Sequence, residues 1–316
     1  MLGIDINSTR VAPWWPANAR YAVDFRTGIG MRDGTHRPMS ELFALTRSTP
    51  KYAQDSTGRW SSFAANVAAI TDLGILVEPA ATNLVADNSG ETSTAMTGVT
   101  ASPWPVDDTP IRGLGARRLV QGSGASDGFL RVLPLSGGVT YTASRFYKYD
   151  GSTTWVRVSI SDNVAHGFFA FINLQTMSIG ATGAFGAATF HRCILSPSWN
   201  GWYRVQLTGA VPNTNAVSGF FSHSVTTNNV TARAAGSYGI CGDQLEASAI
   251  GTSPIVTAGS PSSRATEQLI VASPTPVAGT ATKPDGSTED LGLFAGGTEI
   301  ILLNIAALKI WFYTPA

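Results

Sequence analysis

From about residue 84 to residue 272 the sequence is a succession of short segments with alternating side chains, separated by clusters of Gly, Pro, Asn and Asp. About nine of these segments are predicted strands: ARRLVQG, GFLRVLPL, VTYTASRFYKY, TTWVRVSI, HGFFAFINL, ATFHRCIL, GWYRVQLTG, GFFSHSV and SYGICGDQLEAS. No helical period interrupts the series. This pattern is typical of a β-sandwich or jelly roll, so we expect an all-β chain. In VTYTASRFYKY, the residues Tyr141, Ala143, Arg145 and Tyr147 should share one face of the strand.

The flanking regions differ from this pattern. Residues 1–80 are irregular, with a short strand pair predicted in YAVDFRTGIGMRDG, and we interpret them as an N-terminal anchoring segment. Residues 273–316 combine a Pro- and Gly-rich linker with the apolar tail LGLFAGGTEIILLNIAALKIWFYTPA. An exposed apolar strand edge promotes association, so the tail is predicted to be a short oligomerisation segment. Docking against the sandwich and a buried C-terminal helix are the alternatives.

The charge balance excludes some classes of partner. Lys plus Arg equals Asp plus Glu at 21 each, and charged residues make up only 13% of the chain. No net field would gather nucleic acid, anionic lipid or an acidic substrate, so we expect no nucleic-acid partner. No apolar run approaches the roughly 18 residues that a membrane helix needs, and MLGIDINSTR has no signal-peptide features. We therefore predict no membrane insertion and no export by a signal peptide.

The sequence contains no convincing catalytic constellation. The four histidines have no acidic neighbour, and adjacent carboxylates such as Asp107 and Asp108 point to opposite sides of an extended chain. The two cysteines, Cys193 and Cys241, are too few for a disulfide framework, although one bridge is compatible with the sequence. We therefore predict that the protein is not an enzyme and requires no cofactor.

Aromatic residues in turns suggest a binding role. Sugar rings stack on aromatic planes while Asn, Asp and Arg bond the hydroxyls. Trp199 lies in the turn PSWNG and Trp155 in GSTTWVRV follows another turn, and Asn200 and Arg157 lie near them in the sequence. These four residues are candidate carbohydrate contacts. The alternative for the tryptophans is core packing.

Four segments, in order, resemble motifs of one group of proteins. LGILVEPAATNLVADNS resembles G-L-L-I-E-P-A-R-T-N-L-L, and CGDQLEASAIGTSPIVTAGSPSSRATEQL resembles G-A-Q-L-E-A-G-x-x-A-T-S-Y-I-P-T…T-R-A. Between them, GWYRVQLTG is similar to a G-W-Y-R-V strand, and FALTRSTPKYAQDSTGRW upstream is similar to F-T-R-A-S-x-A-T-Y-x-D-x-x-G. These motifs occur in phage, prophage or gene-transfer-agent-like tail-fibre, tail-spike and head-fibre proteins. Ala81 departs from the usual Arg of the first motif.

The resemblance implies a fold and a metal site. It implies that residues 81–272 form a domain similar to jelly-roll carbohydrate-binding modules. Such modules often hold a structural calcium ion between their first and last strands, which makes Asn83, Asp243 and Glu246 candidate ligands. Purely structural hydrogen bonding is the alternative role for these three residues.

Together these inferences predict a virion fibre or spike protein that binds host-cell surface polysaccharide. It would be made in the bacterial cytoplasm, released by lysis and located in the virion, next to other virion proteins at the tail or a capsid vertex. A homo-oligomer is expected, with a trimer favoured and a pentamer as the alternative. The competing functions are a polysaccharide depolymerase and a purely structural decoration protein without a ligand.

Overall fold

The computed structural model describes residues 14–88, 95–133, 135–162, 165–213, 219–273, 277–295, 298–302, 305–307 and 309–313. Among these residues there are β-strands and two short 3-10 turns, η1 (Met39–Glu41) and η2 (Trp199–Gly201), but no α-helix. In the described residues, no helix is long and apolar enough to span a membrane. The chain divides into two compact units. The first contains Met1–Thr46, Ile70–Val77 and Gln268–Ala316, and the second contains Arg47–Ala69 and Glu78–Glu267.

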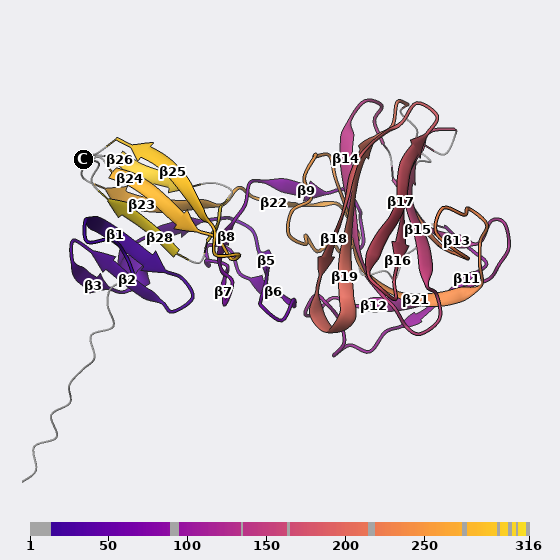
Figure 1. Cartoon of the computed structure of the whole chain (residues 1–316), viewed down its shortest axis with the longest axis horizontal. Helices are drawn as coiled ribbons and strands as arrows, with labels where there is room; N and C mark the ends of the chain where they lie inside the picture. The colour runs from indigo at the N-terminus through magenta and orange to yellow at the C-terminus, as the bar shows by residue number, and fades with distance from the viewer. Residues whose placement is uncertain are drawn as a thin grey trace, which may run out of the picture. The chain divides into compact units, whose positions relative to one another are not determined.

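The second unit is built on two six-stranded antiparallel sheets (Figure 1). Sheet I has the order β10 (Ala95–Thr97), β13 (Gly128–Val132), β20 (Gly219–Val225), β15 (Trp155–Ser161), β16 (Gly167–Asn173) and β17 (Ser178–Phe185). Sheet II has the order β11 (Val99–Pro103), β12 (Ala116–Gln121), β21 (Gly236–Glu246), β14 (Thr140–Lys148), β19 (Trp202–Ala210) and β18 (Thr189–Pro197). The chain crosses between the sheets several times, which gives a jelly-roll sandwich.

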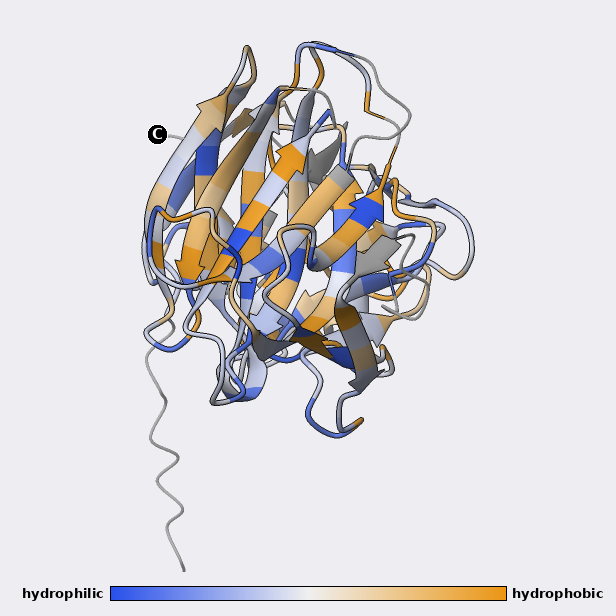
Figure 2. Cartoon of the chain, turned by 90° about the vertical axis from the view of Figure 1, so that its right-hand side faces the viewer, coloured by the Kyte–Doolittle hydropathy of each residue, from blue (hydrophilic) through white to orange (hydrophobic). Residues whose placement is uncertain are grey.

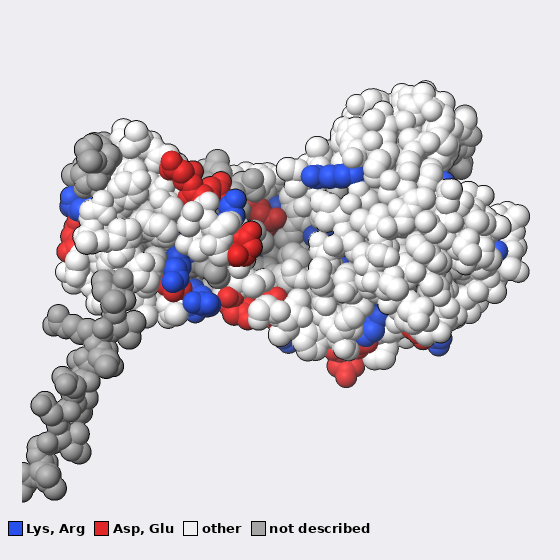
Figure 3. Space-filling view, in the orientation of Figure 1, with Lys and Arg blue, Asp and Glu red and all other residues white. Residues whose placement is uncertain are grey.

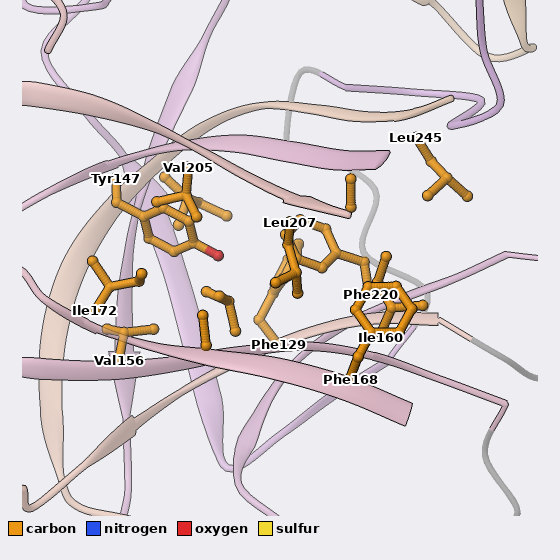
Figure 4. Packing of buried hydrophobic residues seen from close by; sticks show 14 of the residues in the cluster. Phe129, Tyr147, Val156, Ile160, Phe168, Ile172, Val205, Leu207, Phe220 and Leu245 are labelled. Atoms are coloured by element: carbon orange, nitrogen blue, oxygen red, sulfur yellow. The ribbon is translucent and has the colours of Figure 1, made fainter. Parts of the chain in front are cut away.

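The core of this unit lies between sheet I and sheet II. Alternate residues such as Val156, Val158 and Ile160 of β15 are buried there and pack with Leu207 of β19 and Phe220 of β20 (Figure 4). Figure 2 shows the corresponding alternation of hydrophobic and hydrophilic residues along neighbouring strands. Because residues of one strand face alternately inward and outward, the pattern in the sequence decides which side chains enter the core.

The all-β jelly-roll prediction is confirmed. All nine predicted segments contain a strand, and Tyr141, Ala143, Arg145 and Tyr147 of β14 are all buried in the interior between the sheets. Strands β10, β11 and β17 of the two sheets lie outside the nine predicted segments. In β17 the segment SIGATGAF consists largely of small residues, so it gives little alternation between apolar and polar side chains.

A buried charge cluster crosses the sandwich core. The carboxylate of Asp243 on β21 accepts hydrogen bonds from Arg145 of β14 and, at 3.2 Å, from Arg131 of β13. Burial raises the pKa of Asp243, but the two guanidinium groups outweigh it and hold that pKa below its ordinary value. The Arg145 guanidinium also lies over the rings of Phe129 and Phe220, at 4.5 and 4.2 Å from their centroids. The cluster links sheet I to sheet II inside an otherwise apolar layer.

The outer face of sheet II is covered by segments distant in sequence. Its side chains Phe146, Trp202 and Cys241 form a second core with Trp60 and Ile111, which lie outside the sheet. Trp60 begins β6 (Trp60–Phe63), which pairs with β5 (Lys51–Gln54); β9 (Ala81–Asn83) pairs with β22 (Ser262–Arg264). Residues 47–69 therefore belong to the sandwich unit and not to an N-terminal segment ending at residue 80, because they bury its outer apolar side chains.

The first unit joins the two ends of the chain. Its largest sheet has the order β25 (Thr288–Phe294), β24 (Val277–Thr282), β28 (Lys309–Tyr313), β1 (Ala19–Asp24), β2 (Ile29–Arg32) and β3 (Thr35–Arg37). Two three-stranded sheets complete it: β26 (Thr298–Leu302), β23 (Gln268–Ser273) and β4 (Ala44–Thr46); and β27 (Ile305–Ala307), β8 (Gly74–Val77) and β7 (Ile70–Thr71). The predicted strand pair near the N-terminus is confirmed as β1 and β2.

This unit changes the interpretation of the apolar tail. Strand β28 lies between β1 and β24, so the backbone groups on both of its edges are used within the chain. The expected division into an independent segment 1–80 and a separate segment 273–316 is therefore wrong for the described residues. The tail pairs within its own chain, because β28 forms hydrogen bonds with the edge of β1 that β2 leaves free. Assembly into an oligomer remains a prediction.

We expect Asp243→Ala to lower the free energy of unfolding by about 3–5 kcal/mol, because it leaves the buried Arg145 guanidinium without its carboxylate. Urea denaturation followed by tryptophan fluorescence measures this. The double variant Asp243→Ala/Arg145→Leu should recover part of the loss, since it removes the uncompensated charge. Asp285→Ala, at an exposed turn, is the control. Equal stability of Asp243→Ala and the control would show that the cluster has no such role.

Candidate functional site

The segments that carry the resemblance converge on one buried ion cluster in the second unit. Glu267 accepts hydrogen bonds from Arg47 and, at 2.5 Å, from Lys51. Glu78 lies 3.1 Å from Arg264 and 3.5 Å from Lys51, and it also accepts a hydrogen bond from Ser253. We call Arg47, Lys51, Glu78, Arg264 and Glu267 the motif cluster. Its members lie up to 220 residues apart in sequence.

The motif cluster is a structural device. Burial raises the pKa of Glu78, but Arg264 and Lys51 hold it below the ordinary value, so the carboxylate stays charged. The side chains of Arg47, Lys51 and Glu267 are completely buried. Both carboxylates are fully engaged with cations and hydroxyl groups, which leaves neither as an acid or base for a substrate.

The three candidate calcium ligands each have partners in the protein. The amide of Asn83 donates to the carbonyl oxygens of Asp243 and Ile255, and its oxygen accepts from two backbone amides. The Asp243 carboxylate faces two arginines, and Glu246 accepts hydrogen bonds from Gln244 and Thr252. Among the described residues no group of three His, Cys, Asp or Glu side chains is arranged to hold a metal ion. The geometry thus fits the structural alternative better, and calcium binding stays a prediction.

The structure separates the predicted carbohydrate contacts into two places. Trp199 and Asn200 lie in η2, between β18 and β19 of sheet II. The Arg59 guanidinium lies 5.1 Å from the Trp199 ring centroid, and Asn200 donates a hydrogen bond to Asp108 at 2.8 Å. Asp108 also accepts from Lys148 and from the indole of Trp104. Trp199 and Asn200 therefore help to anchor the loops that cover sheet II.

Trp155 and Arg157 lie on the outer face of sheet I. The odd-numbered residues of β15 point away from the core, because Val156 and Val158 point into it. Arg157 is opposite Phe171 on one neighbouring strand and His223 on the other. The Arg157 guanidinium lies 4.7 Å from the ring centroid of Phe169 and 5.7 Å from that of Phe185. The half-buried Trp155, Arg157 and Phe169, the exposed Phe185 and the buried His223 form what we call the aromatic face.

Glycines allow these side chains to lie close against the sheet. A Cβ atom at Gly180 would lie 2.7 Å from the Trp155 ring, and one at Gly167 would lie 2.5 Å from the Phe185 ring. Real Cβ contacts are almost never so short, so a larger residue would push the rings away from the backbone. The Phe169 ring likewise approaches Gly183. The rings therefore lie over the strands of sheet I instead of standing upright from them.

The loop between β20 and β21 packs onto this face. The side-chain oxygen of Asn228 accepts a hydrogen bond from the Ala181 amide at 2.7 Å, beside Trp155. At the other side, the Arg233 guanidinium lies over Gly128, where an added Cβ would be 2.7 Å away, and next to His223. The loop thus bounds the aromatic face without covering Phe185, which is 36% exposed.

The aromatic face is locally cationic. Burial, and secondarily the nearby Arg233, lower the pKa of Arg157 below its ordinary value. Burial lowers the pKa of His223 to about 3, with Arg233 and Arg157 adding to the effect, so its imidazole is neutral near pH 7. The Nδ1 atom of His223 and the Nε atom of Arg157 have no hydrogen-bond partner among the described residues. Two guanidinium groups and a neutral imidazole therefore lie among exposed and half-buried rings.

Only Trp155 and Arg157 of the aromatic face were among the candidates predicted from the sequence. Phe169, Phe185, His223 and Arg233 were not among them. A signal was present for the phenylalanines, because GFFAFIN and SIGATGAF place Phe and Gly on the outward positions of neighbouring strands. No local signal placed Arg233 there, since it reaches the face from a loop.

A cavity of about 340 Å³ is a weaker candidate. It is lined by Tyr52, Ser62, Pro254, Ser263 and Arg264, among others, within the second unit. Its only charged lining residue among those described is Arg264, whose guanidinium is already bonded to Ser253 and Pro79 and paired with Glu78. The described lining of the cavity thus has one aromatic residue, Tyr52, and its one charged residue is already in an ion pair.

Comparisons with known proteins give structural neighbours only. No protein-family model matches the sequence, and the search of curated proteins finds no match. One similar structure is the CBM22-1 and GH10 modules of Clostridium thermocellum xylanase 10B complexed with xylohexaose (14% identity, 52% of this chain, 28% of that chain, TM-score 0.30). Another is the CBM22-1 xylan-binding domain of Paenibacillus barcinonensis Xyn10C (12% identity, 56% of this chain, 94% of that chain, TM-score 0.31).

A third similar structure is the CBM22-1 and CBM22-2 tandem domain of the same Paenibacillus enzyme (11% identity, 74% of this chain, 89% of that chain, TM-score 0.31). The match to the Clostridium chain spans less than a third of that chain's length. At these TM-scores the likenesses carry no argument about ligand or residues. The functional inference therefore rests on the geometry of this chain.

We expect the stability of the protein to fall from pH 7.5 to pH 5 because of His223. Its folded-state pKa of about 3 is below the ordinary value of 6.5. Between pH 7.5 and pH 5 the imidazole therefore becomes protonated in the unfolded chain but stays neutral in the folded protein, which favours unfolding. The free energy of unfolding should drop by about 2 kcal/mol more in the wild type than in His223→Gln. Urea titrations at the two pH values measure this difference. Parallel pH curves for the two proteins would contradict it.

Proposed function

We propose that the protein is a non-enzymatic carbohydrate-binding component of a virion fibre or spike, and that it attaches to host-cell surface polysaccharide through the aromatic face. The observation that carries the proposal is the set of rings, Trp155, Phe169 and Phe185, laid over glycines around a guanidinium group. Apolar ring planes beside hydrogen-bond donors are the chemistry that recognises the C–H-rich faces and hydroxyl groups of sugars.

The shape of the face favours a polymer. Its side chains come from β15, β16, β17 and β20, so they extend across several neighbouring strands and not around a closed pocket. Such an open surface contacts a polysaccharide chain along its length and leaves both of its ends free. Affinity per site is then modest and would be raised by multivalent display, which agrees with the predicted homo-oligomer, trimer or pentamer.

The arrangement of carboxylates supports binding over catalysis. The outward positions of β13, β15, β16 and β20 hold no Asp or Glu, and the buried carboxylates Glu78, Asp243 and Glu267 are committed to cations. Hydrolysis of a glycosidic bond normally needs two carboxyl groups on either side of it. A depolymerase site made by several chains is the competing proposal, and release of reducing ends from a bound polysaccharide would favour it.

The virion assignment rests on the four sequence segments. Arg47, Glu78, Arg264 and Glu267, which lie in three of them, meet in the motif cluster, so these matches belong to one structural feature of the sandwich. This coherence supports the resemblance to phage fibre and spike proteins. Other virion proteins at a tail or capsid vertex would then be the partners, and the virion would be the location.

We expect Trp155→Ala and Phe169→Ala each to weaken polysaccharide binding by about tenfold, because each removes one stacking ring. Affinity gel electrophoresis against a panel of bacterial capsular polysaccharides, after a glycan array has chosen the panel, measures the change. Trp199→Ala is the matched control, since Trp199 lies in η2, between two strands of the other sheet. Urea midpoints confirm that each variant is folded.

Two outcomes would overturn this assignment. If Trp199→Ala weakens binding and Trp155→Ala does not, the ligand is bound near η2 and not on the aromatic face. If the wild type binds no polysaccharide as a monomer or when displayed on a multivalent bead, the adhesion function is wrong. A purely structural decoration role would then be favoured.

A further inference from the structure

The aromatic face carries positive charge without a paired acidic side chain. Arg157 on β15 and Arg233 in the loop after β20 lie on either side of His223. Neither arginine is in a salt bridge with any Asp or Glu among the described residues. The nearest acidic influence is Asp127, which acts electrostatically on Arg233 and whose carboxylate accepts a hydrogen bond from the Gly124 amide.

Four of the buried arginines of this unit form ion pairs: Arg145 and Arg131 with Asp243, Arg47 with Glu267, and Arg264 with Glu78. Buried Arg204 has no ion pair among the described residues, but the carboxylates of Glu246 and Glu78 act on it electrostatically. Bringing a guanidinium group out of water is costly unless an opposite charge compensates it. Arg157 is partly buried between two rings, which attract a cation, but burial and the like charge of Arg233 both act against its charged form. An uncompensated cation at an open aromatic surface indicates that the compensating anion comes from the ligand.

The positions of the two guanidinium groups limit what that anion is attached to. Arg157 lies beside the rings of Phe169 and Phe185, and Arg233 lies over Gly128, next to His223. Guanidinium groups bind carboxylate and sulfate groups through paired, charge-assisted hydrogen bonds to two oxygens, whereas a neutral sugar hydroxyl offers a single uncharged oxygen. The buried imidazole of His223 lies between them and is neutral near pH 7, so it adds no charge.

We propose that the polysaccharide bound on the aromatic face is anionic, with its carboxylate or sulfate groups held by Arg157 and Arg233. This inference rests on the proposed carbohydrate-binding function. The chain has no net charge, so the preference arises from direct contacts and not from long-range attraction of polyanions. It should therefore persist at an ionic strength of about 0.15 M, where the Debye length is only about 8 Å.

The test compares each anionic polymer with a neutral polymer of the same backbone. Alginate is paired with carboxyl-reduced alginate, and dextran sulfate with dextran, so that the two arms separate carboxylate from sulfate recognition. The full-length wild type, Arg157→Gln, Arg233→Gln and Trp155→Ala are measured by affinity gel electrophoresis at physiological ionic strength. Arg112→Gln removes the same charge at an exposed residue of the same unit and serves as the control.

We expect the wild type to bind at least one anionic polymer about 10- to 100-fold more tightly than its neutral partner. Arg157→Gln and Arg233→Gln should each reduce that ratio about tenfold, while Arg112→Gln leaves it unchanged. Trp155→Ala should weaken binding to the charged and the neutral polymer by the same factor, because it changes stacking and not charge.

The outcomes separate the two proposals. Equal affinity for charged and neutral polymers, with both weakened by Trp155→Ala, overturns the anionic preference and leaves the carbohydrate-binding function intact. A preference that Arg112→Gln reduces as much as Arg157→Gln shows non-specific attraction and also overturns the inference. Absence of binding to all four polymers and to the capsular panel overturns both proposals.

Discussion

The motif cluster is the interaction on which the arrangement of the sandwich depends. Its ion pairs join residues 47–51, 78 and 264–267, which no local interaction could bring together. In the same region Asn83 accepts a hydrogen bond from the Leu245 amide of β21, and Trp60 packs with Phe146 and Trp202. These long-range contacts cover the part of the outer face of sheet II around Phe146, Trp202 and Cys241. The aromatic face lies on the outer face of the other sheet, sheet I.

Charged residues make up only 13% of this protein, and most of the buried ones in the larger unit form ion pairs. Figure 3 shows that charged side chains are few on the visible face of the larger unit. Inside that unit, most buried charges belong to the motif cluster or to the group around Asp243, where acids and bases meet. Buried Arg204 has no ion pair in the described part of the chain, but Glu246 and Glu78 act on it electrostatically. The half-buried Arg157 differs, because the charge that acts on it is the like charge of Arg233.

The glycines of sheet I explain how a β-sandwich surface becomes a stacking surface. Side chains on a sheet normally stand away from it, and cross-strand neighbours crowd one another. Gly128, Gly167 and Gly180 remove that crowding, so an arginine and two aromatic rings can lie across the strands. Glycine weakens a strand, and the loss is tolerated here because the opposite face of the same strands is densely packed in the core.

The sequence by itself determined the all-β class, the nine main strands and the inward face of β14, because alternation and turn residues act over a few neighbouring positions. It also placed Trp155 and Arg157 among the candidates. It could not separate Trp155 from Trp199, since one follows a turn and the other lies in one. Only the tertiary structure placed them at different sheets, because the position of a side chain depends on how distant segments fold together. The same reason accounts for Arg233, which reaches the site from a loop, and for the apolar tail, whose partner strands lie at the opposite end of the chain.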